Sequence, residues 1–200
     1  MRSSTLAPIA ATFALLVACS RDSATTAAAT EVGAGETARG AATIGELKRT
    51  LVAALTQAMA TSVPAAIEMC QIQAPAIAAG LSSDGITVGR ATRKPRNPTN
   101  LAAGWQAEAL THFEELRAAG TKLPGTSFAR RLADGRIAYA EPLMIQPLCL
   151  ACHGATLASE VQEVLATRYP EDRATGYAEG DLRGIAWVEL PRSSVPPKQP

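Results

Sequence analysis

The chain has 200 residues, of which 47% are hydrophobic but only 4% are aromatic. This length accommodates one folded domain with additional segments, and much of the apolar content is alanine. The 19 basic and 18 acidic residues balance, and no basic stripe alternates with aromatic residues, which argues against nucleic acid as a partner.

The first residues have the features of an export signal. Arg2 supplies a positive charge, and the apolar run LAPIAATFALLVA after it is too short to predict a transmembrane helix. The run ends in Leu16-Val17-Ala18-Cys19, which resembles the site where a bacterial lipoprotein is cleaved and its cysteine lipidated. Residues 1–18 are therefore predicted to be a lipoprotein signal peptide, with lipidation at Cys19; the alternative is an ordinary signal peptide. Ser20 follows the cysteine, as in Gram-negative lipoproteins of the outer membrane, so the expected location is the periplasm, with a lipid anchor in that membrane.

Two stretches are expected to have no regular structure. Residues 19–42 are dominated by small and polar side chains and show no apolar period, which predicts a flexible tether. Residues 192–200, at the end of PRSSVPPKQP, are predicted to be a disordered tail. The folded domain is therefore expected over residues 43–191.

Two helices are predicted at the start of this domain. Thr43 can cap the first, which runs from Ile44 to about Thr61, with Glu46 completing a capping box. Ser62 can cap the second, and Pro64 is tolerated in its first turn. Apolar residues then recur at steps of three and four along one face of the second helix: Val63, Ile67, Cys70, Ala74 and Ile77.

The remainder of the domain predicts strands mixed with helices. GITVGRAT is predicted to form a strand, and KPRNPTN, with two prolines and two asparagines, an ordered loop. Asn100 can cap a third helix that reaches Ala119, and SFARRLADGRIAYAEPLMI predicts a hairpin around Asp134-Gly135. A short helix near Leu157 to Ala166 and a last strand, GIAWVEL, follow. Early helices and later antiparallel strands predict the α+β class.

The segment PLCLACHG carries the strongest chemical signal. Its Cys149-x-x-Cys152-His153 spacing is the pattern that attaches a c-type haem, with two thiols bonded to the haem vinyl groups and the histidine bound to iron. The export signal agrees, because such haem is attached outside the cytoplasm. One covalent haem c is therefore the expected cofactor. The alternatives are a Cys149–Cys152 disulfide, or half of a zinc site that only Cys70 and His112 could complete.

The side chain on the other side of the iron separates an electron carrier from a sensor. Electron-carrying c-type cytochromes use a methionine there, and of Met59, Met69 and Met144 only Met59 lies on a predicted apolar face at a suitable distance from the motif. His112 falls at the edge of the apolar side of its helix, as a surface histidine does. Cys70 lies at the centre of its apolar helix face, where it is either a ligand or an inert buried cysteine.

Three segments in a fixed order carry a resemblance to a known family. AIEMCQIQAPAIA, VGRATRKPRNPTN and CLACHG resemble bacterial and cyanobacterial single-haem proteins with a PAS-like sensor domain, which also occurs as the extracytoplasmic part of histidine kinases. The resemblance covers roughly residues 44–191. It implies a PAS-like antiparallel sheet with flanking N-terminal helices, and a c-type haem with His153 and the Cys70 thiolate as axial ligands. Arg96 and Asn97 match the Arg-Asn-Pro motif of that family and are expected to belong to the cofactor site.

Thiolate ligation has a functional consequence. A thiolate donates electron density to iron and favours the ferric state, and two strong ligands leave no open position for resting peroxidase or oxygen-carrier chemistry. No additional histidine, acid pair or Ser/His/Asp pattern supports catalysis, so no enzyme activity is expected. Reduction weakens the iron–thiolate bond, and departure of Cys70 would open the iron to NO or CO. The predicted function is a redox or gas sensor that signals to a separate partner protein. The alternative is an electron-transfer cytochrome with His/Met ligation.

Three arginines near the predicted loop are candidates for contact with the haem propionates. Arg90, Arg93 and Arg96 could each bind a carboxylate through two parallel hydrogen bonds. Arg96 is favoured because prolines stiffen the loop that carries it. The alternative is an ordinary solvated charged edge.

Overall fold

The computed structural model describes residues 31–192 of the chain. The predicted signal peptide, the lipidation site Cys19 and all but the first residue of the predicted tail lie outside the described residues. Within residues 31–192, no helix combines the length and the apolar character needed to cross a membrane.

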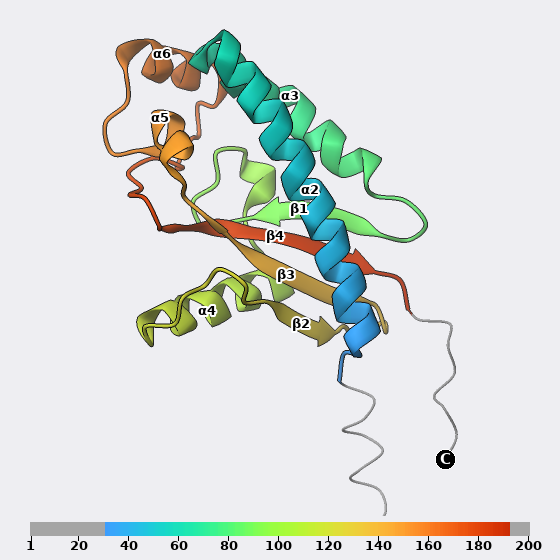
Figure 1. Ribbon diagram of the computed structural model, residues 1–200. Coiled ribbons are helices and arrows are strands. Elements are labelled where there is room, and N and C mark those ends of the chain that lie inside the picture. The colour runs from blue at the N-terminus through green and yellow to red at the C-terminus, as the bar shows by residue number, and fades with distance from the viewer. Residues whose placement is uncertain (1–30, 193–200) are drawn as a thin grey trace, which may run out of the picture. The chain divides into compact units, whose positions relative to one another are not determined.

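A four-stranded antiparallel sheet forms the centre of the domain, as the predicted α+β class requires. The strands are β1 (Thr87–Ala91), β2 (Phe128–Arg131), β3 (Ile137–Met144) and β4 (Leu182–Leu190), in the order β1-β4-β3-β2. The predicted hairpin is confirmed as β2 and β3, with Gly135 at a φ of +86° in the turn. Figure 1 shows α2 lying across one face of this sheet and α4 on the other.

The first helix, α2 (Ala34–Thr61), begins earlier than predicted. Residues 34–42, expected in the tether, are helical, and the Glu36 carboxylate accepts a hydrogen bond from the Gly33 backbone N–H at 3.0 Å. Thr43 does not cap the helix, because its hydroxyl donates to the Arg39 carbonyl inside it. The packing residue of this added segment is the buried Gly40, which touches the Tyr139 ring. A glycine contact adds nothing to the apolar periodicity of a sequence. The periodicity therefore did not predict that residues 34–42 are helical.

The second helix, α3 (Val63–Gly80), starts as predicted, with the Ser62 side chain accepting a hydrogen bond from the Ala65 N–H at 3.1 Å. On the predicted face Ile67 and Ala74 are buried. Met69, expected off that face, is only 3% exposed. The reason is that α3 contacts α2, the sheet and α6, so more than one of its sides is covered.

The third predicted helix begins later than predicted. Pro98–Asn100 form a 3-10 turn, and α4 (Trp105–Ala118) begins after Gly104, whose φ is +52°. Asn100 therefore does not cap α4. The chain instead pairs Leu101 with Thr92 before it enters the helix, a long-range contact that local sequence cannot reveal.

The hydrophobic core consists of one cluster on each face of the sheet and a smaller third cluster. One cluster lies between α2 and the sheet and includes Ile44, Leu47 and Val188; another lies between α4 and the opposite face and includes Phe113 and Ile185. A smaller third cluster joins α3 to α6 (Ser159–Arg168) and includes the partly buried Cys152, which places the attachment motif at the end of the domain where these helices meet.

Candidate haem site

The Cys-x-x-Cys-His motif occupies a tight helical corner after β3. Pro147–Cys149 form a 3-10 turn and Leu150–His153 a single α-helical turn, α5. Because residues three apart lie on the same side of a helical turn, Cys149 and Cys152 are presented together. Both are half-buried free thiols, so the disulfide alternative is not what the structure shows.

His153 is held with one ring nitrogen engaged and the other available. Its Nδ1 lies 2.6 Å from the carbonyl oxygen of Ala174, and a carbonyl only accepts, so Nδ1 carries the proton. Burial, reinforced by the charges of Arg96 and Arg183, lowers the pKa of His153 from 6.5 to about 3. The imidazole is therefore neutral at physiological pH, with an Nε2 lone pair available to a metal.

Cys70 of α3 joins this group from the other side. Cys152 packs against the cluster that contains Ile67, and Ile67 lies one turn before Cys70 on α3. Burial raises the pKa of the Cys70 thiol, whereas Arg90 and Arg96 oppose the shift; the pKa of Cys152 is also raised by burial and by the Cys70 charge. Cys70, Cys149 and Cys152 are therefore close enough for the charge of one thiolate to act on another.

Two of the other candidate iron ligands lie on the α4 side of the sheet. Met144 belongs to the cluster between the sheet and α4, and His112 packs against the rings of Phe113 and Phe128, at 5.3 and 5.6 Å between centroids. Both therefore lie on the α4 side. Met59 is half-buried near the end of α2 and remains the candidate for a His/Met site.

Arg96 ties the attachment turn to the loop that supports His153. Its buried guanidinium donates from Nη2 to the Cys152 carbonyl and from Nε to Asp172 Oδ2 at 3.1 Å. The other oxygen of Asp172 accepts from the Ala174 N–H at 2.8 Å, and Ala174 in turn accepts from His153. The carboxylate that Arg96 binds is thus supplied by the protein itself.

Asn97 has a local partner as well. Its side-chain oxygen accepts from the Thr99 backbone N–H at 3.0 Å and from the Thr99 hydroxyl at 2.8 Å. In the described structure Asn97 therefore shapes the loop that presents Arg96. Arg93 is turned toward α4, where it pairs with Glu114 at 2.7 Å.

Sequence reasoning missed four contributors to the site: Asp172, Ala174, Arg183 and Tyr169. Arg183 is buried enough that its pKa is lowered, and the Tyr169 ring lies 5.9 Å from the Arg96 guanidinium. None belongs to a recognisable motif, and each reaches the site through a loop or strand whose partner is distant in sequence. Asp172 and Arg173 follow Tyr169 within four residues, but this stretch shows no sequence pattern that indicates a binding site.

The donor set fits a covalently attached haem. Two thiols lie one turn apart, a neutral imidazole presents Nε2, and a third thiol approaches from α3. Within residues 31–192, no three His, Cys, Asp or Glu side chains converge as ligands of a single metal ion. A zinc site, which needs four convergent ligands, therefore has no support in the described part of the chain.

These features define an α+β domain in which a Cys-x-x-Cys-His turn and a helical cysteine meet at one end of an antiparallel sheet. The Tll0287-like family model matches residues 22–191, so the chain belongs to the Tll0287-like family. Its fold is similar to the crystal structure of the cyanobacterial heme-protein Tll0287, with a TM-score of 0.58 and 26% identity over 80% of this chain and 97% of that chain. No curated protein matches the sequence. Family and structure together support the resemblance to a haem protein family.

Proposed function

We propose that this chain is an extracytoplasmic haem protein that carries one covalent haem c on Cys149 and Cys152. His153 and the Cys70 thiolate are the axial ligands. The observation that carries the proposal is the neutral His153 imidazole, fixed through Nδ1 to Ala174, beside two free thiols and facing the helix of Cys70. The relative Tll0287, described as a heme-protein, supports the choice of cofactor, and the antiparallel sheet with N-terminal helices is the arrangement that a PAS-like domain requires.

The protein's own residues perform three tasks in this proposal. Cys149 and Cys152 prevent loss of the cofactor, and the Arg96–Asp172 pair fixes the turn that carries them. Ala174 orients His153 and makes its Nε2 a stronger donor. Bound haem supplies an iron that exchanges one electron and that binds NO or CO when an axial position is free.

Cys70 is the switching residue of the proposed sensor. Cys70 would hold the iron as a thiolate, a donor that favours the ferric over the ferrous state, so its hold would weaken when an external donor reduces the iron. Its neighbours Glu68 and Gln71 contact Arg168 at the end of α6, at 3.2 and 3.1 Å. A change at Cys70 therefore reaches two helices, as a signal to a separate partner protein needs.

Electron transfer is the second candidate function. Leu148, directly before the attachment cysteine, is 44% exposed. An exposed apolar residue beside the attachment turn is where a redox partner could approach. A His/Met site using Met59 belongs to this alternative, and neither function assigns an enzyme activity to the chain.

Covalent attachment tests the proposed cofactor directly. The chain is produced with a c-type haem maturation system, denatured, and treated with acid and acetone. We expect the haem to stay on the wild-type chain and on Cys70→Ser, and to be lost from the Cys149→Ala, Cys152→Ala double variant. Free extraction of haem from the wild-type chain would contradict the proposal.

A further inference from the structure

Of the four arginines Arg90, Arg93, Arg96 and Arg183, only two are paired with a carboxylate within residues 31–192. Arg93 pairs with Glu114 at 2.7 Å and Arg96 with Asp172 at 3.1 Å. Arg90 and Arg183 have no ion-pair partner among residues 31–192; the Nη1 of Arg183 donates only to the neutral oxygens of Thr92 and Lys94, at 2.9 and 3.0 Å.

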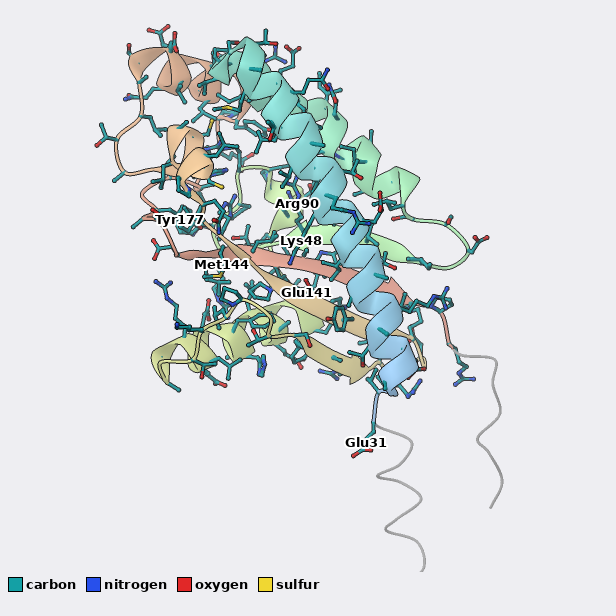
Figure 2. All side chains as sticks on the ribbon, in the orientation of Figure 1. Glu31, Lys48, Arg90, Glu141, Met144 and Tyr177 are labelled. Atoms are coloured by element: carbon teal, nitrogen blue, oxygen red, sulfur yellow. The ribbon has the colours of Figure 1, made fainter. Side chains whose placement is uncertain are left out.

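Strand geometry places Arg90 on the face that α2 and α3 cover. Side chains alternate along a strand, and Val88, two residues before Arg90, belongs to the core cluster under α2. Figure 2 shows Arg90 on this side of the sheet. Glu141 lies in the same row, because Arg90 pairs with Ala186 and Ala186 with Glu141. The Glu141 carboxylate is already taken by Lys48, at 2.7 Å.

A β-bulge gives Arg183 its direction. Leu143 pairs with Gly184 and Met144 with Leu182, so Arg183 is the extra residue of β4. Bulges of this kind re-aim one side chain next to functional sites. Gly184 has a φ of +158°, and a Cβ there would lie 2.4 Å from the carbonyl oxygen of Ala91. The bulge therefore depends on glycine.

Arg183 is connected to the candidate site through Tyr177, whose ring centroid lies 5.4 Å from the Arg183 guanidinium and 6.4 Å from the His153 ring centroid. Burial lowers the pKa of Arg183, and the charges of Arg96 and Arg90 add to this shift. Among Arg90, Arg96 and Arg183, only Arg96 has a carboxylate partner within residues 31–192, that of Asp172. Buried charges are normally paired, so this part of the structure is short of two negative charges.

The β4 residues in the row of Arg90 and in the row two residues away along β4 are small. Ala186 and Gly184 are the β4 residues in the rows of Glu141 and Leu143, on the strand between β1 and β3. Haem is flat and carries two propionate carboxylates at one edge.

We propose that Arg90 and Arg183 bind the two haem propionates, one guanidinium to each carboxylate, and that Arg93 and Arg96 do not. This inference rests on the proposed function, since it requires haem at the Cys149–His153 turn. It replaces Arg96, the favoured candidate from sequence, with a residue that only the bulge in β4 reveals. The Arg183 guanidinium, stacked 5.4 Å from the Tyr177 ring centroid, is held in place for this contact.

The test is resonance Raman spectroscopy of the holoprotein, together with its reduction potential. Arg90→Gln and Arg183→Gln should each shift the propionate-bending band of one propionate. Each should also lower the reduction potential, because an uncompensated carboxylate stabilises ferric iron. Arg93→Gln is the matched control, and its bands and potential should equal those of the wild-type protein.

Wild-type bands and potential in both glutamine variants would overturn the inference, and so would a band shift produced by Arg96→Gln alone with its covalent haem retained. If a glutamine variant yields no holoprotein, the propionate-bending bands of Arg90→Lys and Arg183→Lys are measured instead. An ammonium cannot reproduce two parallel guanidinium hydrogen bonds, so the bands must still shift, and unchanged bands overturn the inference. A wild-type chain without covalent haem would instead overturn the proposed function, and this is measured before any arginine variant.

Discussion

Arg96 donates a hydrogen bond from its guanidinium to the backbone carbonyl of Cys152, 56 residues further along the chain. The same side chain binds Asp172, and Asp172 binds the backbone of the residue that orients His153. One buried arginine therefore fixes both the Cys149–His153 turn and the orientation of His153. This relationship assigns Arg96 a positioning role.

Arg96→Ala should strongly destabilise the protein. It leaves the Asp172 carboxylate, whose side chain is 11% exposed, without its partner. Removal of one member of a buried pair typically costs about 3–5 kcal/mol. Urea unfolding of the holoprotein measures the loss. Arg93→Ala removes a half-exposed pair and should cost at most about 1 kcal/mol. Equal losses for the two variants would contradict the positioning role of Arg96.

Gln71 should control how firmly Cys70 is held. Its side-chain N–H donates to the Arg168 carbonyl and its oxygen accepts from the Arg168 guanidinium, both at 3.1 Å. Gln71→Ala removes this clamp one residue after Cys70, so reduced protein should release Cys70 more readily and bind CO faster. The exposed Gln73 lies on the same helix, and Gln73→Ala should leave the CO rate at the wild-type value. Identical rates in the two variants would argue against coupling between α3 and α6.

A pair of glycines tests the early start of α2. A Cβ on Gly40 would lie 2.6 Å from the Tyr139 ring, whereas nothing lies within 4 Å of one on Gly35. Gly40→Ala should therefore destabilise the protein by about 1–3 kcal/mol through overpacking. Gly35→Ala should stabilise it by up to about 1 kcal/mol, because alanine favours a helix over glycine. If residues 34–42 were a flexible tether, neither substitution would change the thermal midpoint.

Lipidation at Cys19 remains a prediction from sequence. Cys19→Ala should leave a chain that is exported but no longer anchored to a membrane. Fractionation of cells producing the two proteins measures this, with the haem stain as a marker of export. A variant that stays in the membrane fraction would exclude Cys19 as the anchor.

Local patterns in the sequence identified those parts of the fold that depend on local interactions. Ser62 caps α3 through its own hydroxyl, and Asp134-Gly135 supplies the turn of the β2–β3 hairpin. The spacing of Cys149, Cys152 and His153 likewise lies within a single helical corner. Each of these features is complete within a few residues.

Features that need a distant partner were inaccessible to the same reasoning. The first turns of α2 are packed through Gly40, whose importance is visible only beside Tyr139. The sequence singled out Arg96 as a propionate contact, but its partner in the structure, Asp172, comes from a loop without a motif. The direction of Arg183 depends on the register between β3 and β4, which no periodicity in β4 alone can reveal.

The axial ligand opposite His153 is the most direct test of the account. Optical and electron paramagnetic resonance spectra of the ferric holoprotein are compared with those of three variants: Cys70→Ser, Met59→Leu and His112→Ala. We expect low-spin ferric iron with a red-shifted thiolate charge-transfer band. Cys70→Ser should convert it to high-spin iron or recruit another ligand, and should raise the reduction potential. Met59→Leu and His112→Ala should leave the spectra unchanged. A low-spin spectrum that survives Cys70→Ser but is lost in Met59→Leu would identify a His/Met electron carrier and contradict the sensor proposal.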